Sequence, residues 1–133
     1  MNEAEMNAVV ARVPFFRFIG FSVTEASAET CQATLPFRET LIGNPVARNF
    51  HGGIVASVME VLASLAVMRD GTDAIPKPVN ITVDYLRPAR ATTLLAGAIV
   101  TRRGRRLVSV RAEAWQEDRS KLVAQGLVHF LIA

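Results

Sequence analysis

The fold is decided by the stretch HGGIVASVMEVLASLAVMR, residues 51 to 69. Its apolar residues go round every side of a helix, so it predicts one long helix from Gly52 to about Arg69, buried on nearly every side. Such a helix is on the order of 27 Å long at 1.5 Å per residue. At 100° per residue, the small and polar residues share one stripe about 60° wide: Gly53, Ser57, Glu60 and Ser64. Small residues permit close approach of a backbone or a ligand, and Glu60 is the only charge among them.

A membrane span is the first alternative for this stretch. The residues from Phe50 to Met68 contain one charge, Glu60. A carboxylate in the middle of a span costs about 3 kcal/mol, and no basic flank follows the positive-inside pattern. The start, Met1-Asn2-Glu3-Ala4-Glu5, is acidic where a targeting peptide would be basic. We therefore expect an unprocessed cytoplasmic protein that does not bind membranes.

Shorter elements flank the long helix. Apolar residues at helical spacing predict a helix over 2–12 that ends before Pro14, and mixed Thr-, Ser- and Val-rich sequence predicts two strands between Phe21 and Phe37. Glycine, asparagine and proline predict a loop over 38–50. A second loop, from Gly71 to Pro78, precedes four strands. The first, at 79–85, alternates apolar Val79, Ile81, Val83 and Tyr85 with polar residues, which predicts a half-buried strand. The other three lie at about 92–102, 106–116 and 121–132. This order predicts an α+β protein, one domain over 1–133, with an antiparallel sheet of about six strands around a central helix.

The composition argues against a disulfide scaffold and against a metal site. The 133 residues are 50% hydrophobic and 20% charged, with a single cysteine. A chain of this size can bury a core without disulfides, and Cys31 alone cannot form an internal bridge. Neither Cys31 nor the two histidines, His51 and His129, show the spacing of metal ligands. We expect no disulfide and no metal.

The charge is uneven along the chain. Between Arg87 and Arg111 there are seven arginines and no acidic residue. This asymmetry indicates a local anion site, for which nucleic acid or a phosphorylated small molecule is a candidate ligand, while a solvated hairpin tip is the simpler alternative. No nucleic-acid recognition motif or aromatic platform accompanies the arginines, so we expect no nucleic-acid partner.

The chemistry of the chain gathers at the start of the long helix. A helix N-terminus offers unpaired backbone N–H groups and a positive dipole end, and the glycines of His51-Gly52-Gly53 let a carbonyl oxygen approach them. A carboxylate such as Glu60 can activate water or attack an acyl carbon. The simpler alternative is that His51 caps the helix and that Glu60 is a buried residue paired with an arginine such as Arg87.

Three motifs together resemble a known family. They are GNP at 43–45, HGG at 51–53 with an acid nine positions after the histidine, and TVDYLRP at 82–88. The chain resembles, over residues 14–132, the hotdog-fold acyl-CoA thioesterases of the phenylacetyl-CoA and 4-hydroxybenzoyl-CoA thioesterase group. The resemblance implies a hotdog fold, thioester hydrolysis and no cofactor beyond the coenzyme A of the substrate. It also implies a homodimer or dimer of dimers in which each site takes residues from two chains.

The resemblance assigns roles residue by residue. Glu60 is implied as nucleophile or general base, and the Gly52 amide as the group that polarises the thioester carbonyl, with His51 and Gly53 beside it. Ser64 matches a helix position at which relatives carry a hydroxyl. In this family a supporting Asn or Gln side chain commonly precedes the HGG motif by about six positions. Asn44, which lies seven positions before His51, is the candidate for this role, and Asn49 is the alternative candidate. The coenzyme A phosphates are expected on arginines: Arg87, Arg90, Arg103, Arg105 and Arg106.

Some alternatives stay open at this point. The phenylalanines from Phe15 to Phe21, with Phe50, are either plain core or part of an acyl pocket. A hotdog dehydratase or hydratase would carry a histidine further upstream of the acid, and none precedes His51. A module that binds acyl-CoA without turnover would share the fold, and fold alone does not decide between them.

Overall fold

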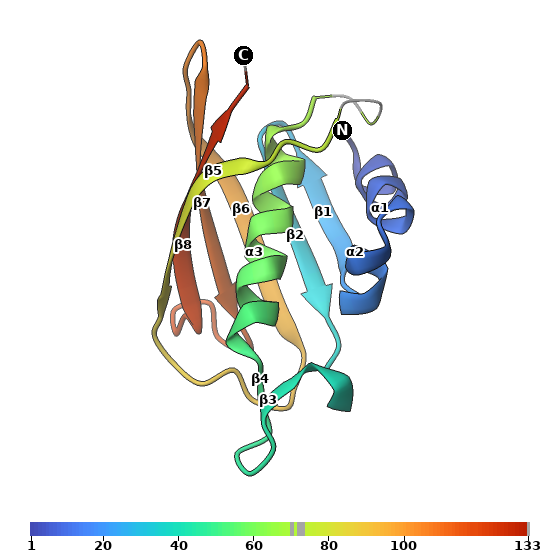
Figure 1. Ribbon diagram of the computed structural model, residues 1–133, viewed down its shortest axis with the longest axis vertical. Helices are drawn as coiled ribbons and strands as arrows, with labels where there is room; N and C mark the ends of the chain where they lie inside the picture. Colours follow the sequence, from blue (N-terminus) through green and yellow to red (C-terminus); the bar gives the residue numbers. More distant parts are fainter. Residues whose placement is uncertain (70, 72–73, 133) are drawn as a thin grey trace.

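An antiparallel sheet of six strands curves around one long helix, α3 (Figure 1). The computed structural model describes residues 1–69, 71 and 74–132. The strands lie side by side in the order β1 (Ser22–Ser27), β2 (Thr30–Leu35), β6 (Leu94–Arg103), β7 (Leu107–Trp115), β8 (Ala124–Leu131) and β5 (Pro78–Tyr85). The predicted α+β architecture, with six strands around a central helix, is confirmed.

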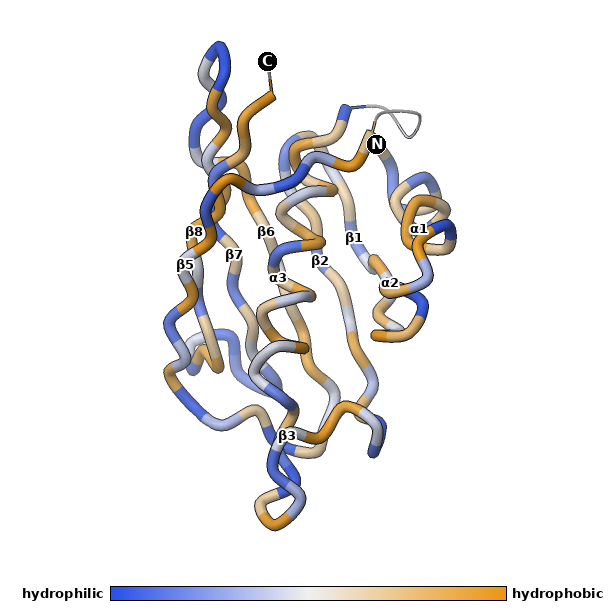
Figure 2. The backbone as a smooth tube through the Cα atoms, in the orientation of Figure 1, coloured by the Kyte–Doolittle hydropathy of each residue, from blue (hydrophilic) through white to orange (hydrophobic). Residues whose placement is uncertain are grey.

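Helix α3 (Gly52–Val67) is the core of the molecule, but it is not buried on every side. Every residue from Val61 to Val67 is buried, whereas Gly53, Ser57 and Glu60 reach solvent. The reason is that the sheet covers only one side of the helix, and the segment that covers the other side lies near its C-terminal end: the Ser64 hydroxyl donates to the Pro76 carbonyl at 3.1 Å. The prediction of burial on nearly every side is therefore wrong for the N-terminal half. Figure 2 shows apolar residues along most of α3 and on the strands behind it.

The N-terminal segment forms two helices, and only the first was predicted. Helix α1 (Glu3–Arg12) is capped by Asn2, whose side chain accepts from the Glu5 amide at 2.8 Å. Pro14 then opens a second helix, α2 (Pro14–Ile19), because proline is well suited to a first helical position. Gly20, in the left-handed region at φ 85°, ends it. Arg38 holds this end, since its guanidinium donates to the carbonyls of Phe18 and Ile19.

Residues 38–50 are more ordered than the predicted loop. They contain a 3₁₀ turn, η1 (Glu39–Leu41), and a small hairpin of β3 (Ile42–Asn44) and β4 (Asn49–Phe50). The Asn44 side chain closes the hairpin by accepting from the amides of Val46 and Ala47, at 3.0 and 3.1 Å. The prediction of a plain loop was therefore wrong. The Asn44 side chain stabilises the turn, and the content of glycine, asparagine and proline does not reveal that β3 and β4 pair.

Strand β5 lies at the edge of the sheet and shows only part of its predicted alternation. Ile81 and Val83 pack against the core, but Val79 and Tyr85 are exposed. Strand β5 pairs with β8 on one side only, so its other edge has no neighbouring strand among the described residues. Strand β5 begins at Pro78, one residue before the predicted start, and residues 72 and 73 of the loop expected before it lie outside the described part of the chain.

Two further observations bear on the sequence predictions. Cys31 is buried in β2, and this burial raises the pKa of its thiol to about 12, so the thiol is neutral at physiological pH. Within the described residues, no helix is both long enough and apolar enough to cross a membrane.

Candidate active site

The start of α3 leaves one backbone amide without an acceptor. His51 is the N-cap, and its Nδ1 accepts from the Gly53 amide at 2.8 Å. The His51 carbonyl accepts from the next two amides, those of Ile54 at 2.9 Å and Val55 at 3.3 Å. Among the described residues, the Gly52 amide makes no hydrogen bond. It is therefore a free N–H at the positive end of the helix dipole.

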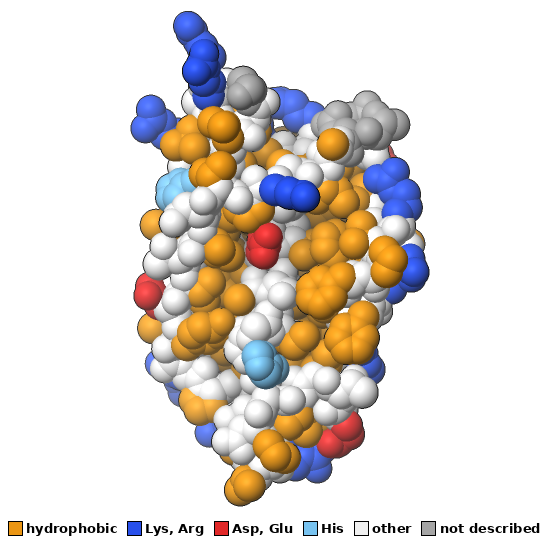
Figure 3. All heavy atoms as spheres, in the orientation of Figure 1, with side chains coloured by type: hydrophobic (Ala, Val, Ile, Leu, Met, Phe, Trp, Pro, Cys, Tyr) orange, Lys and Arg blue, Asp and Glu red, His pale blue; other side chains and the backbone are white. Residues whose placement is uncertain are grey.

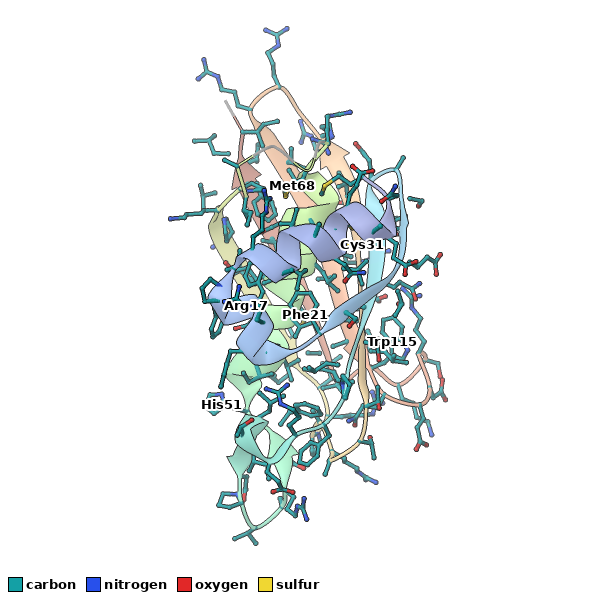
Figure 4. All side chains as sticks on the ribbon, turned by 90° about the vertical axis from the view of Figure 1, so that its right-hand side faces the viewer. Arg17, Phe21, Cys31, His51, Met68 and Trp115 are labelled. Atoms are coloured by element: carbon teal, nitrogen blue, oxygen red, sulfur yellow. The ribbon has the colours of Figure 1, made fainter. Side chains whose placement is uncertain are left out.

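Gly43 lets the β3–β4 hairpin approach this helix start. A Cβ on Gly43 would lie 2.6 Å from the His51 Cα, which only a glycine avoids. The His51 amide also donates to the Leu41 carbonyl at 2.8 Å. Figure 4, in which His51 is labelled, shows the histidine at the lower end of α3 beside the hairpin. The fold thus fixes the backbone just before Gly52.

Tyr85 packs on Gly52 from the end of β5. Its hydroxyl donates to the Gly52 carbonyl at 2.8 Å, and its ring lies 3.3 Å from where a Gly52 Cβ would be. Tyr85 was not predicted as a site residue, because strand alternation grouped it with the inward apolar residues of β5. The available signal was a polar hydroxyl at an inward position within TVDYLRP.

Two adjoining grooves open beside the Gly52 amide. The first, of about 390 Å³, is lined by residues that include Asn49, Phe50, Gly52, Tyr85, Arg87 and Val123. The second, of about 500 Å³, shares Arg87, Pro88 and Val123 with the first and extends to Arg90, Asp118 and Lys121. A molecule bound along both grooves would reach from a free amide to a set of exposed cations.

The arginines predicted to bind phosphate fall into two groups. Arg87, which donates to the Leu122 carbonyl at 2.8 Å, and Arg90 line the grooves beside Gly52. Arg103 pairs with Glu29 at 2.6 Å and donates to the Val67 carbonyl at 3.2 Å, at the opposite end of α3. Arg105 and Arg106 follow at the tip of the β6–β7 hairpin, which projects past that end (Figure 1). Of these five arginines, Arg87 and Arg90 are the two that line the grooves beside Gly52 in the described chain.

The second groove is also lined by two acidic residues, Glu117 and Asp118. The Ser120 hydroxyl and amide donate to Asp118 Oδ1 at 2.7 and 2.9 Å, and these hydrogen bonds lower the pKa of the carboxyl. Asp118 is therefore ionised at neutral pH. An anion in this groove would be drawn toward Arg87 and Arg90 and away from Asp118.

Glu60 is half-buried on the open stripe of α3. In the described part of the chain its carboxylate has no hydrogen-bond or ion-pair partner, and the pairing with Arg87 that was the simpler alternative is absent. Figure 3 shows an acidic side chain and a histidine over α3, with hydrophobic side chains on both sides of them. Glu60 follows Gly52 by eight residues, which is about 12 Å along the helix axis.

The other polar residues of the stripe satisfy backbone groups. Ser57 donates to the Gly53 carbonyl at 2.7 Å, and Ser64 lies 3.1 Å from the carbonyls of both Glu60 and Pro76. Ser64 is only 4% exposed, because the segment before β5 covers it. Helical spacing placed Ser64 correctly on the stripe, but it could not show this cover.

The two asparagines lie at different places. Asn44 uses its side-chain oxygen within the β3–β4 turn and is exposed. Asn49 lines the first groove beside Gly52. The structure thus brings the substitute, Asn49, to the groove, and leaves Asn44 in the turn.

The phenylalanines divide between core and surface. Phe21 and Phe50 are buried, and Phe50 packs edge-on against Phe37 with ring centroids 5.4 Å apart. Phe15 and Phe18 of α2 are each 50% exposed and stack on one another at 6.4 Å. Phe21 and Phe50 therefore belong to the core, whereas Phe15 and Phe18 lie on the surface of α2.

Sequence comparison identifies the family to which this arrangement belongs. The family model described as "Thioesterase superfamily" matches residues 48–123, which include the Gly52 amide, Glu60 and the grooves. The chain belongs to the thioesterase superfamily.

Similar proteins extend this finding. A solved structure from the thioesterase superfamily is 32% identical, covers 98% of both chains and has a TM-score of 0.88. The medium/long-chain acyl-CoA thioesterase YigI of Escherichia coli K12 is 25% identical over 123 residues, which cover 82% of this chain and 79% of YigI. A Halobacterium salinarum relative that carries an esterase name is 38% identical over 95 residues, covering 65% of this chain and 60% of that protein.

The same neighbours confirm the hotdog fold. The Escherichia coli PaaI protein from the phenylacetic acid degradation operon superposes with a TM-score of 0.82 over the full chain, but at 19% identity this likeness shows the fold alone. In this thioesterase-superfamily chain, the fold places a free amide at one end of α3 and a carboxylate in its middle. These are the two kinds of group that acyl transfer requires, an oxyanion donor and a nucleophile or base.

Proposed function

We propose that this thioesterase-superfamily protein hydrolyses acyl-CoA thioesters in an active site that two copies of the chain build together. The observation that carries the proposal is the free amide of Gly52 at the start of α3, because this residue lines a groove that continues to Arg87 and Arg90. Glu60, without an ion-pair partner in the described residues, supplies the second reactive group.

The chemistry follows from these two groups. The Gly52 N–H donates to the thioester oxygen, and its hydrogen bond strengthens as that oxygen becomes negative in the transition state. Glu60 either attacks the acyl carbon directly or takes a proton from the attacking water. In both routes the oxygen of water is finally bonded to the acyl carbon, the carbon–sulfur bond breaks, and the coenzyme A sulfur leaves as the thiol.

One chain cannot bring these groups together. About 12 Å of helix separates Gly52 from Glu60, whereas a reacting atom must lie about 3–3.5 Å from its catalytic group. The carboxylate that serves a given Gly52 is therefore proposed to be Glu60 of a second copy. Strand β5 has one free edge, and Val79 and Tyr85 are exposed on it, which supports pairing of two sheets along this strand.

The substrate class is proposed from the grooves and from a relative. Coenzyme A carries a pyrophosphate and a 3′-phosphate, and exposed guanidinium groups at Arg87 and Arg90 fit such oxygens. YigI is named an acyl-CoA thioesterase, which supports a coenzyme A ester here. Membership of the phenylacetyl-CoA and 4-hydroxybenzoyl-CoA thioesterase group stays a prediction from the GNP, HGG and TVDYLRP motifs.

Thiol release from a panel of acyl-CoA esters tests the proposal. The panel contains phenylacetyl, benzoyl, and short and medium straight-chain esters, and it compares wild type with Glu60→Gln. The variant is expected to lose at least about 100-fold in kcat, because it keeps the side-chain size but cannot act as nucleophile or base. Glu25→Gln, at an exposed position of β1, is the matched control and is expected to retain full activity.

Two results would contradict the proposal. Turnover that survives in Glu60→Gln would remove the carboxylate from the mechanism. Tight coenzyme A binding with no turnover of any ester would favour the alternative of a binding module. Circular dichroism and size-exclusion chromatography of each variant show whether a loss of turnover reflects a loss of fold.

A further inference from the structure

The peptide group between Gly52 and Gly53 is held at both of its polar atoms by side chains. Its N–H, which belongs to Gly53, donates to His51 Nδ1 at 2.8 Å. Its carbonyl, which belongs to Gly52, accepts from the Tyr85 hydroxyl at 2.8 Å. The orientation of this peptide plane is thus fixed from two directions, once by the residue before the helix and once by the far edge of the sheet.

Without these two side-chain contacts, the Gly52–Gly53 segment of the backbone would be flexible. Two glycines in succession have more accessible backbone conformations than any other pair, and the first turn of a helix has few internal hydrogen bonds. The free Gly52 amide lies directly before the held peptide group, so its direction depends on the torsion angles of Gly52. The Tyr85 ring, 3.3 Å from the missing Cβ, further limits rotation at Gly52.

Tyr85 itself is anchored by the sheet. It pairs with Ala124 in the β5–β8 ladder, and the amides of Leu86 and Arg87 both donate to the Val123 carbonyl, at 2.8 and 3.2 Å. Its Cα is therefore fixed by the backbone of β8. Through its hydrogen bond to the Gly52 carbonyl, the Tyr85 hydroxyl holds the start of α3 at a fixed place relative to the sheet.

We infer that Tyr85 is a positioning residue that aims the Gly52 amide, a role that rests on the proposed thioester hydrolysis. The alternative, that Tyr85 merely stabilises the fold, is disfavoured by its place in the molecule. The side chain is 55% exposed at the end of an edge strand, where it contributes little to the core. The hydrogen bond to Gly52 is the only polar contact of its hydroxyl in the described residues.

The test is Tyr85→Phe, which removes the hydroxyl and keeps the ring. On the acyl-CoA ester that wild type turns over best, kcat is expected to fall about tenfold with KM within about twofold of wild type, the loss of one aligning hydrogen bond. The melting temperature should stay close to that of wild type. Thr24→Val, which removes an exposed hydroxyl from β1 at the opposite edge of the sheet, is the matched control and should change none of these values.

A second readout needs no turnover. In ¹⁵N-labelled protein, hydrogen exchange of the Gly53 amide is expected to be about tenfold faster in Tyr85→Phe than in wild type, because the peptide group has lost one of its two side-chain hydrogen bonds. The exchange rate in Thr24→Val should equal that of wild type. This readout separates the positioning contact from the catalytic proposal.

The outcomes are distinct. Faster exchange together with lower kcat supports the inference. Faster exchange in a protein that hydrolyses no thioester supports the contact and shows that the proposed function is the part that failed. Unchanged exchange, or faster exchange with unchanged kcat in an active enzyme, overturns the positioning role of Tyr85.

Discussion

Gly52 is proposed to act through its backbone N–H, and the local geometry allows that one group to be removed. Gly52 is the first residue of α3, a position at which proline is tolerated because the N–H has no partner within the helix. His51 before it has φ −60° and ψ 132°, an extended conformation that suits a residue preceding proline. A proline at position 52 therefore removes the proposed oxyanion donor while the helix can still begin there.

The prediction at this scale compares Gly52→Pro with Gly52→Ala. The alanine variant keeps the N–H and adds a Cβ against the Tyr85 ring, so it controls for the added bulk. Gly52→Pro is expected to lose about 100- to 1,000-fold in kcat, and Gly52→Ala much less. Steady-state thioester hydrolysis with circular dichroism of both variants measures this. Equal activity of the two variants would show that the Gly52 amide is not the donor.

The residues of the candidate site differ in how far sequence could predict them. His51, Gly52, Gly53 and Glu60 belong to one helix and its cap, so local spacing alone relates them. Tyr85 reaches Gly52 from 33 positions away, through the pairing of β5 with β8, and a hydroxyl at an inward strand position does not by itself identify its partner. The burial of Ser64 by the segment before β5 could not be predicted from sequence for the same reason, because that contact also joins two separate segments of the chain.

At the scale of elements, the packing of α3 against the sheet depends on a glycine in β8. A Cβ on Gly126 would lie 2.7 Å from the Thr82 carbonyl oxygen and 3.2 Å from the Met59 side chain. The backbone oxygen cannot move without shifting β5. In β6, a Cβ on Gly97 would meet its nearest neighbours, Arg119 and Trp115, at 3.4 Å, an ordinary contact distance.

Gly126→Ala is accordingly expected to lower the free energy of unfolding by about 1–3 kcal/mol, the usual cost of overpacking. Gly97→Ala, the same chemical change in another central strand, should cost clearly less. Urea denaturation of both variants gives the comparison. A similar loss in both would mean that the contact with β5 does not determine the cost at position 126.

The helices and strands also show which elements sequence patterns can predict and which they cannot. Alternation and helical spacing predicted α1, α3 and the six strands of the main sheet, because each buries a face that its own residues define. Helix α2 and the β3–β4 hairpin were missed. Their ends are held by Arg38 and Asn44, side-chain contacts to the backbone that apolar patterns do not encode.

At the scale of the whole molecule, the account depends on two copies of the chain. The free amide and the carboxylate are about 12 Å apart on one rigid helix, so the open stripe of α3 is proposed to face the stripe of a second copy. In the sequence, residue patterns indicated Gly52 and Glu60 as reactive groups, whereas a dimer was expected only because the chain resembles a known family. The reason is that a surface complementary to itself has no local sequence pattern.

Mixing two inactive variants tests the two-chain site most directly. Glu60→Gln and Gly52→Pro are co-expressed with different tags and the mixed dimer is purified. A mixed dimer has one site with both defects and one with an intact Gly52 amide and an intact Glu60, so half of its sites are active. The unfractionated equal mixture should then recover about a quarter of wild-type activity.

The matched control replaces the Gly52→Pro chain by one that carries both substitutions, which cannot restore any site. The account predicts recovery in the first mixture and none in the control. A purified mixed dimer with no activity above that of either variant alone would contradict the central claim that each active site joins Gly52 of one chain to Glu60 of another.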